Sequence, residues 1–363
     1  MNSRTAQLAH AQMLLPEDRK IASHMRGFEQ TRAPRLRDLC GADDILGCMS
    51  KMTTGASSLG RAAEVLTDML RSAQIVLTLS GVASVGKLDY IIAELIDMGF
   101  IKAVVATGAV ITHGCSHEMG GKMFHIDEEQ VDQGVDVGLY NRGLNRVFDT
   151  VELEKSLEDT GDLVCDILRS GVMGDCFGSF ELHCEMGKYL NKHCPHEDGI
   201  LHAAARKKVP VFVPAFTDSE IGLAVMRYLF EEDEPFYDGF RDFKEYADWA
   251  KNATKPLGIL TLGGGVPRNW AQQIGPYFDT LTDRKMIELP KPIRFQYAVR
   301  ICPEVTNWGG LSGCTYSEGI SWGKFIPEKE GGKFAEVYAD YTHVFPLLIR
   351  GVMERVRPMP QGR

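Results

Sequence analysis

Short apolar runs that alternate with amphipathic stretches are the feature that most constrains the fold of this 363-residue chain. Six runs predict strands: QIVLTLSG (74–81), KAVVATG (102–108), VPVFVPAFTD (209–218), PLGILTLGGG (256–265), IRFQYAVRIC (293–302) and FAEVYAD (334–340). Helical patterns lie between or after them, over 87–99, 219–232 and 341–356. This alternation predicts an α/β fold, a doubly wound, Rossmann-like parallel sheet with helices on both faces.

The chain shows no internal repeat and no low-complexity segment. Residues 46–363 are predicted to form a single domain, preceded by an irregular or locally helical N-terminal extension, 1–45. The middle of the chain, through LVCDILRSG and SFELHCEMGKYLNK to ILHAAARKK, is predicted to be mostly helical.

Charge and cysteine content narrow the class of protein. A formal net charge of -9 offers no basic surface for nucleic acid and agrees with cationic substrates. No apolar run is long enough to span a bilayer, and the N-terminus lacks a signal-peptide pattern, so no membrane association is expected. The nine cysteines, an odd number, are expected to be the reduced thiols of a cytoplasmic protein.

Small or polar residues end four of the predicted strands: Ser80 and Gly81, Thr107 and Gly108, Thr217 and Asp218, and Gly263 to Gly265. Beyond the carboxyl ends of parallel strands, bare backbone N–H groups and helix N-termini can bind a phosphate-bearing cofactor. Glycines also end strands for structural reasons alone, and the chain has neither a G-x-G-x-x-G fingerprint nor a P-loop. Both interpretations of these turns stay open.

The stretch SEGISWGKFIPEKE (317–330) places Trp322 two residues and Glu318 six residues before Lys324. A lysine that is desolvated beside an aromatic ring has a lowered pKa and supplies a nucleophilic amine near neutral pH. Glu318 would oppose that shift, but its carboxylate suits a cationic substrate amine. From these residues alone, a solvated lysine after a turn is the simpler interpretation.

Histidines and cysteines gather between residues 183 and 196, where a metal site has to be considered. They lack the short paired spacing that is typical of zinc ligands, so no metal site is predicted.

Several motifs together resemble one family, the deoxyhypusine synthases, from about residue 45 to 355. The motifs, in the family's order, are MTTGASSLGRA (52–62), PAFTD (214–218), LGGGV (262–266), SWGK (321–324) and VYADYTHVFPLL (337–348). Enzymes of this family oxidise spermidine with NAD and pass its aminobutyl group, through an imine on a lysine, to an acceptor amine. The resemblance implies NAD as cofactor, polyamine substrates and a homotetramer with its sites between paired subunits.

By the same resemblance, Lys324 carries the imine, Trp322 flanks the polyamine chain and Glu318 contacts substrate amines. The positions implied to contact NAD are Ser80, Gly81, Thr107, Gly108, Asp218, Gly263, Gly264, Asp340 and Tyr341. The two aspartates are expected to bind ribose or amide groups, with structural capping as the alternative.

The chain departs from the family mainly where substrate is bound. Asn269 stands where the eukaryotic enzymes have a histidine that manages protons, and an asparagine cannot titrate near neutral pH. Leu223 and Leu311 replace aspartates that hold polyamine nitrogens. His113 replaces a glutamate and is a candidate proton carrier. Arg300 replaces a tyrosine and suggests a substrate carboxylate, which a guanidinium binds bidentately.

The stretch GGLSGCTYSEGISWGK (309–324) resembles a bacterial, deoxyhypusine synthase-like branch of the family. Bacteria generally lack the translation factor that carries hypusine. We therefore expect transfer of an aminobutyl or similar alkylamine group between small amines, as in the homospermidine synthases. Two alternatives are a deoxyhypusine synthase that modifies a protein lysine and a catalytically silent NAD-binding protein, which Asn269 would favour.

Overall fold

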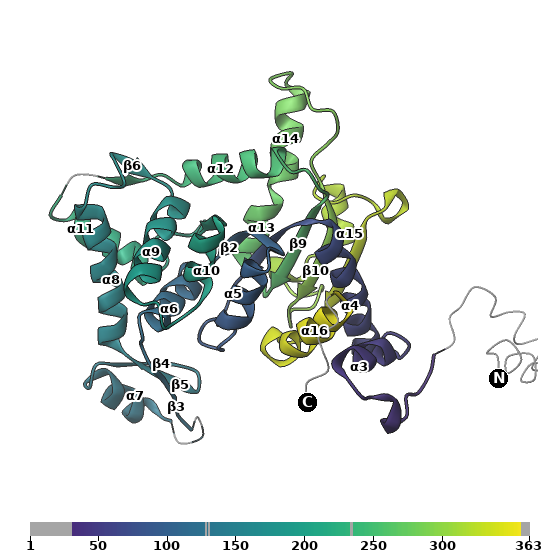
Figure 1. The fold of residues 1–363 in the computed structure, drawn as a ribbon, viewed down its shortest axis with the longest axis horizontal. Coiled ribbons are helices and arrows are strands. Elements are labelled where there is room, and N and C mark those ends of the chain that lie inside the picture. The colour runs from purple at the N-terminus through teal and green to yellow at the C-terminus, as the bar shows by residue number, and fades with distance from the viewer. Residues whose placement is uncertain (1–30, 128, 130, 233–234, 357–363) are drawn as a thin grey trace, which may run out of the picture.

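A six-stranded parallel sheet lies at the centre of the molecule, in the order β11–β10–β9–β1–β2–β7 (Figure 1). The computed structural model describes residues 31–356 apart from 128, 130, 233 and 234. The strands are β1 (Gln74–Leu79), β2 (Ile101–Ala106), β7 (Val211–Phe212), β9 (Leu257–Leu262), β10 (Phe295–Ile301) and β11 (Lys333–Val337). All six correspond to runs predicted from the sequence, and the predicted α/β fold is confirmed.

Helices cover both faces of the sheet, which is why its strands are apolar on both sides. On β1, Ile75 and Leu77 belong to one hydrophobic core, whereas Val76 belongs to a second core on the opposite face. The first core includes α3 (Ala42–Met49), α4 (Thr54–Ser72), α5 (Asp89–Asp97), α6 (Gly108–Glu118), α8 (Glu154–Arg169), α9 (Ser179–His193), α10 (Ile200–Lys207), α11 (Glu220–Leu229) and α16 (Tyr341–Val356). The second includes α12 (Gly239–Lys251), α13 (Gly265–Gln272), α14 (Ile274–Asp283) and α15 (Tyr316–Ser321).

The strand order reverses beside β1. The chain runs from β1 outward to β2 and β7, and then returns to the other side of β1 with β9, β10 and β11. The connection after β1 therefore runs toward one edge of the sheet and the connection after β9 toward the other. The place where the strand order reverses is the switch point of the sheet, and open α/β sheets bind ligands there.

A small antiparallel sheet, in the order β3–β5–β4, lies with α7 at one end of the molecule (Figure 1). Its elements are β3 (Met123–His125), α7 (Gln133–Tyr140), β4 (Leu144–Val147) and β5 (Thr150–Leu153). The three stretches predicted to be helical in the middle of the chain are indeed helices, α8, α9 and α10, whereas this small sheet precedes them and was not predicted. Strands of three or four residues are too short to show a clear alternation of apolar and polar residues.

The remaining short elements are η1 (Leu36–Asp38), β6 (Cys176–Phe177), β8 (Phe236–Tyr237), η3 (Leu311–Gly313) and η4 (Glu328–Glu330). Of the predicted N-terminal extension, residues 1–30 lie outside the described part of the chain, and the described remainder holds η1 and the start of α3. No helix in the described ranges is long and apolar enough to cross a membrane.

Candidate functional site

The turns after β1 and β9 interlock at the switch point. The backbone N–H of Gly264 donates to the Ser80 hydroxyl at 2.7 Å. A Cβ at Gly263 would lie 2.3 Å from the same hydroxyl oxygen, and the φ of +84° at this residue also favours glycine. The Tyr341 hydroxyl donates to the Ser80 carbonyl at 2.9 Å and packs against Gly81. Four predicted cofactor positions, Ser80, Gly81, Gly263 and Gly264, thus lie together with Tyr341.

The turn after β2 extends this group of residues toward β7. The Thr107 N–H donates to the carbonyl of Leu79 at the end of β1. A Cβ at Gly108 would lie 2.3 Å from the Cβ of Ser219, the residue that caps α11. The Thr107 hydroxyl is buried with no hydrogen-bond partner among the described residues, and no side chain caps α6. Bare N–H groups at the start of α6 can therefore meet an anion.

The two aspartates predicted to bind the cofactor differ in their contacts. Asp218 is exposed immediately before α11. Asp340 accepts hydrogen bonds from the backbone N–H and the hydroxyl of Thr342, at 2.8 and 2.7 Å, where α16 begins. The structure thus shows the capping role for Asp340, and its contact with a cofactor stays a prediction.

Lys324 lies in a cleft between α13 and α15, on the second face of the sheet. The cleft has a volume of about 330 Å³. Lys324 Nζ donates to the side-chain oxygen of Asn269 at 3.2 Å. The backbone of Lys324 is fixed on both sides, because its N–H donates to the Gly319 carbonyl and its carbonyl accepts from Phe295 at the start of β10. The structure thus brings together two residues predicted to act in catalysis, Lys324 and Asn269.

Burial is the main cause that lowers the pKa of Lys324 from its ordinary value, and the neighbouring guanidinium of Arg268 lowers it further. Cys314 and Glu318 act in the opposite direction but do not cancel these effects. Lys324 is therefore a half-buried lysine with an increased fraction of neutral amine, which is the state a nucleophile requires.

Glu318 and Trp322 also line the cleft, as predicted. The Cys314 thiol donates to a Glu318 carboxylate oxygen at 3.1 Å, and the Glu318 backbone N–H donates to the Thr315 hydroxyl at the start of α15. Trp322 is 65% exposed at the rim. The cleft thus combines an amine, a carboxylate and an aromatic ring.

Arg300 has a role different from the one predicted. It is completely buried, and its guanidinium bonds to the carbonyls of Ser312 and Cys314 and to Glu336. The Nη1 and Nη2 donors of Arg300 face protein acceptors, and Arg300 does not line the cleft of this chain, so its predicted contact with a substrate carboxylate finds no support in this position.

His113 lies on α6 and contacts the buried Glu152 of β5, with 2.6 Å between Nδ1 and Oε1. Burial acts to lower the pKa of His113, but the Glu152 carboxylate outweighs it, so the pKa is raised. Within one chain His113 does not line the Lys324 cleft, and its predicted role as a proton carrier there finds no support in its position.

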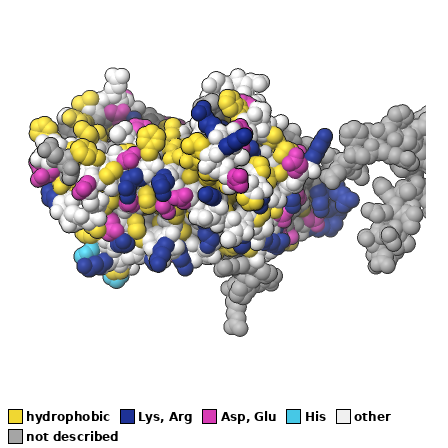
Figure 2. Space-filling view, turned by 90° about the horizontal axis from the view of Figure 1, so that it is seen from above, with side chains coloured by type: hydrophobic (Ala, Val, Ile, Leu, Met, Phe, Trp, Pro, Cys, Tyr) yellow, Lys and Arg dark blue, Asp and Glu magenta, His cyan; other side chains and the backbone are white. Residues whose placement is uncertain are grey.

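The two leucines predicted to replace substrate-binding aspartates lie on separate elements. Leu223 is 62% exposed on α11, on the same face as Met226 and Phe230. Figure 2 shows hydrophobic side chains gathered on this end of the molecule. Leu311 belongs to η3, and its side chain lies outside the described part of the structure.

Arg268 and Cys314 are cleft residues that the sequence did not reveal. A signal existed for Arg268, because it immediately precedes Asn269 in the helix that follows the glycine turn. Cys314 carried no signal, since its contact with Glu318 depends on the turn before α15. In the described ranges, no group of three or more side chains that could hold a metal ion comes together.

Comparison with known proteins gives a consistent result. The family model described as deoxyhypusine synthase matches residues 44–352. The chain belongs to this family. A probable deoxyhypusine synthase 2 of Archaeoglobus fulgidus is 33% identical over 299 residues, which is 81% of this chain and 92% of the relative. A deoxyhypusine synthase-like protein of Elusimicrobium minutum is 31% identical over 304 residues, covering 82% of this chain and 77% of that protein.

Among solved structures, a putative deoxyhypusine synthase from Entamoeba histolytica superposes with a TM-score of 0.55 at 14% identity, covering 88% of this chain and 96% of that one. This likeness confirms the fold. The family consists of NAD-dependent transferases of an aminobutyl group, so the predicted family, the transferase class and NAD as cofactor are confirmed.

The residues at the switch point fit NAD. The turn after β9 leaves no room for side chains at Gly263 and Gly264, and α6 begins without a side-chain cap. The buried Thr107 hydroxyl has no hydrogen-bond partner among the described residues. The hydroxyls of Ser80 and Thr107 and the backbone N–H groups at the start of α6, beginning with Gly108, would hold the dinucleotide, and Gly264 would allow its close approach.

Proposed function

We propose that this protein transfers an aminobutyl or similar alkylamine group from one small amine to another and carries it as an imine on Lys324. The observation that carries the proposal is the cleft in which Lys324, half-buried and with a lowered pKa, contacts Asn269 and lies with Glu318 and Trp322. NAD, when bound, supplies the acceptor for a hydride from the donor amine and returns that hydride to the product.

Lys324 performs the transfer by exchanging one imine for another. Its neutral nitrogen attacks the imine carbon of the oxidised donor, the bond to the donor's other fragment breaks, and that fragment leaves as an amine that takes the displaced proton. The acceptor amine then attacks the same carbon and releases Lys324 as a free amine. Asn269 accepts a hydrogen bond from Lys324 and can orient it, but it cannot take up the proton.

The charges around the cleft support small amine substrates with few positive charges. Glu318 is the carboxylate among the described cleft-lining residues of this chain. The buried cation Arg268 lines the same cleft. Each buried ammonium requires an anion or several hydrogen bonds. A substrate that presents one ammonium to this cleft is therefore favoured over one that presents three.

A second candidate function is deoxyhypusine synthesis on a protein lysine. Archaeal relatives such as that of Methanopyrus kandleri, 32% identical over 323 residues, carry the name probable deoxyhypusine synthase. Trp322 is exposed at the rim, so the cleft opens at the surface and a lysine side chain of another protein can approach it.

We also propose the family's homotetramer, in the cytoplasm, with sites at subunit interfaces. The exposed apolar face of α11, formed by Leu223, Met226 and Phe230, supports this assembly, because such faces commonly pack against another chain. Light scattering after gel filtration measures the mass directly, and a monomer at micromolar concentration would contradict it.

The decisive experiment is borohydride trapping. The protein is incubated with NAD and putrescine, spermidine or agmatine, reduced, digested and analysed by mass spectrometry. An NAD-dependent adduct on the Lys324 peptide is expected. Amine products made with a small acceptor would support the leading proposal, whereas modification only of an added protein substrate would support the second candidate. NAD binding without an adduct from any amine would indicate the silent alternative.

A further inference from the structure

Two buried arginines from different elements bind the same turn of backbone, residues 312–314. Arg300 on β10 donates from Nη1 to the carbonyls of Ser312 and Cys314, the latter at 2.8 Å. Arg268 on α13 donates to the Cys314 carbonyl at 2.7 Å. Arg300 is 0% and Arg268 4% exposed, so all three of these hydrogen bonds have a buried donor. The turn is therefore held from two sides.

This turn connects the two halves of the candidate site. The Ser312 hydroxyl accepts from the backbone N–H of Gly265 at 2.9 Å, in the glycine turn after β9. Two residues on, the Cys314 thiol donates to Glu318, and Cys314 lines the Lys324 cleft. A displacement of residues 312–314 would consequently move the cofactor turn and the amine cleft together.

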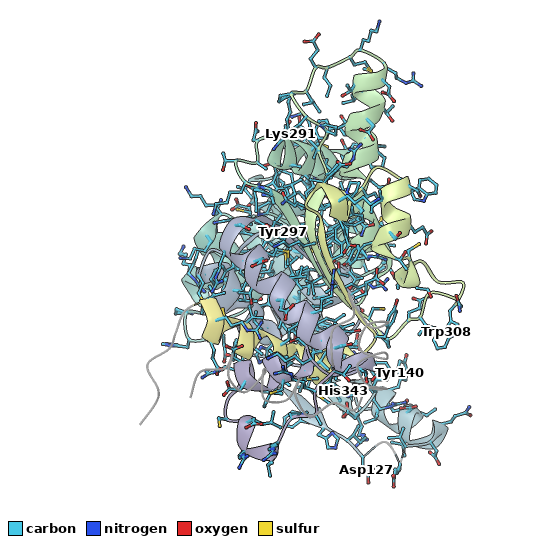
Figure 3. The ribbon with its side chains drawn as sticks, turned by 90° about the vertical axis from the view of Figure 1, so that its right-hand side faces the viewer. Asp127, Tyr140, Lys291, Tyr297, Trp308 and His343 are labelled. Atoms are coloured by element: carbon cyan, nitrogen blue, oxygen red, sulfur yellow. The ribbon has the colours of Figure 1, made fainter. Side chains whose placement is uncertain are left out.

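The loop that leads into the turn, residues 303–310, is largely exposed. It leaves the end of β10 and carries Trp308, which projects from the molecule and is 66% exposed (Figure 3). The contacts that fix its far end are therefore those of the turn itself.

Arg300 is in turn fixed by the neighbouring strand. Arg300 and Glu336 are register partners on β10 and β11, and Nη2 donates to a Glu336 carboxylate oxygen at 3.2 Å. The other oxygen of Glu336 accepts from the backbone N–H of Tyr316, at the start of α15, at 2.7 Å. One carboxylate thus links the arginine to the helix that leads to Lys324.

Stability alone does not account for this arrangement. Burying a guanidinium costs several kcal/mol, and a buried ion pair is often no more stabilising than apolar residues of similar volume. An apolar side chain at position 300, however, could not bind two carbonyls at once, which the planar guanidinium does.

We infer that Arg300 is a positioning residue for the transfer reaction: it fixes the 312–314 turn so that the glycine turn and the Lys324 cleft keep one mutual geometry. The catalytic part of this inference rests on the proposed function of Lys324. The part that concerns the glycine turn does not, because NAD affinity can be measured without turnover.

The test compares Arg300→Met and Arg300→Lys with the wild type. For Arg300→Met we expect the rate of borohydride-trapped adduct to fall about 100-fold, as for a misplacement of about 1 Å, and NAD affinity to weaken about 10-fold. Arg300→Lys should restore part of both, because an ammonium can bond to one of the two carbonyls. Arg241→Met is the control for loss of an arginine, since Arg241 on α12 forms a two-pronged, partly exposed ion pair with Glu181 on α9 and does not line the cleft, so the variant should change the melting temperature alone.

Glu336→Gln covers the case in which Arg300→Met does not fold, because glutamine can keep the acceptor for Tyr316 while its amide nitrogen, which cannot accept, replaces the oxygen that bonds to Arg300. It should lower both readouts to a smaller extent. Folded Arg300→Met or Glu336→Gln protein with wild-type adduct rate and NAD affinity would overturn the inference. If the wild type forms no adduct with any amine, the proposed function fails, and the NAD affinities still decide the role of Arg300.

Discussion

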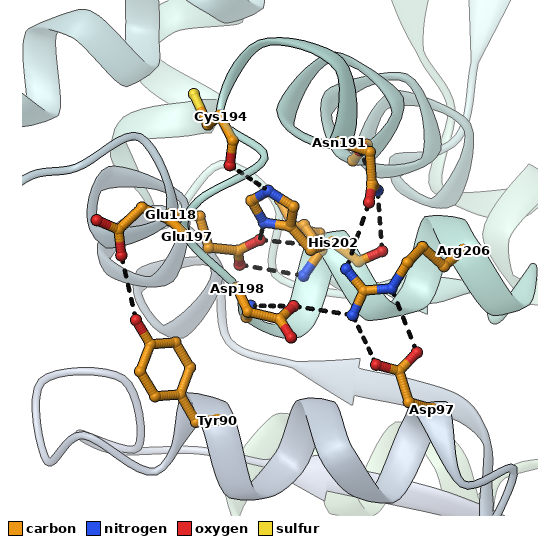
Figure 4. Close-up of polar contacts among 12 residues, drawn as sticks. Tyr90, Asp97, Glu118, Asn191, Cys194, Glu197, Asp198, His202 and Arg206 are labelled. Atoms are coloured by element: carbon orange, nitrogen blue, oxygen red, sulfur yellow. Dashed lines mark hydrogen bonds and ion pairs between the residues drawn. The ribbon is translucent and has the colours of Figure 1, made fainter.

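Two clusters of buried or half-buried ionisable groups differ in how many of their hydrogen-bonding atoms have a partner. In the first, shown in Figure 4, Glu118 accepts from His202 Nδ1 at 2.6 Å and from the backbone N–H groups of Leu201 and His202 at 3.1 and 2.9 Å. His202 Nε2 lies 3.2 Å from the Cys194 carbonyl. In the second, Lys324 Nζ has one hydrogen-bond partner among the described residues, Asn269, and faces a cleft.

The pKa of the basic group is also shifted in opposite directions in the two clusters. Burial acts to lower the pKa of His202, but the Glu118 carboxylate outweighs it and the pKa is raised. For Lys324, burial and Arg268 together lower the pKa. A saturated, closed cluster therefore holds a charge in place and joins helices, whereas an incompletely satisfied base beside a cleft keeps its lone pair for chemistry. This contrast makes four predictions.

The largest effect is expected from removing the lysine. Lys324→Ala should lower the amount of trapped adduct at least about 1,000-fold, because Lys324 is the lysine among the described residues that line the cleft and an imine requires an amine. NAD binding and the melting temperature should be nearly unchanged. Lys333→Ala is the control, since Lys333 forms an exposed pair with Asp68. An adduct that persists in the Lys324→Ala variant would show that Lys324 is not the nucleophile and that the contrast between the two clusters does not mark the reacting group.

Disrupting the Glu118 cluster should lower the free energy of unfolding and leave the reaction unchanged. Glu118→Ala leaves His202 and two buried N–H groups without their acceptor, and we expect a loss of about 3–5 kcal/mol in the free energy of unfolding. Urea denaturation measures this loss. The adduct rate per folded molecule should stay at the wild-type value, and a specific loss of activity would place Glu118 in the reaction.

Removing the cation beside the lysine should change the pH dependence. Arg268→Met raises the pKa of Lys324, so less neutral amine is present at a given pH and the rising limb of the pH–rate profile moves to higher pH. The trapping rate measured across the pH range tests this. Arg300→Met is the comparison, because it should lower the rate without moving the limb.

The smallest effect is expected at Asn269. Asn269→Ala removes one hydrogen bond to Lys324. A hydrogen bond contributes about 1 kcal/mol net, so we expect the adduct rate to fall about 5-fold. Asn269→His restores an acceptor and adds a group that titrates near neutral pH. A new pH dependence in the histidine variant would show that position 269 lies within reach of the transferred proton, and its absence would restrict Asn269 to orienting the lysine.

Local pattern was enough to predict much of this molecule. The six apolar runs specified the strands of the parallel sheet, and the glycines after β1, β2 and β9 marked where these strands end, because backbone conformation and hydrophobic periodicity are properties of neighbouring residues. The SWGK motif and the family likeness pointed to Lys324, and the structure places it in a cleft.

Tertiary structure alone decided which side chains meet. Asn269 contacts a lysine 55 positions away, and His113 pairs with Glu152 on a strand that the sequence did not reveal. The arginine at position 300 suggested a substrate carboxylate, whereas the register of β10 with β11 places it, buried, against Glu336. Pairing of strands and packing of helices set these contacts, and neither is encoded within a few residues of the side chains involved. The sequence by itself thus determined the scaffold and pointed to its lysine, and the fold determined the burial and the neighbours that lower the pKa of this lysine.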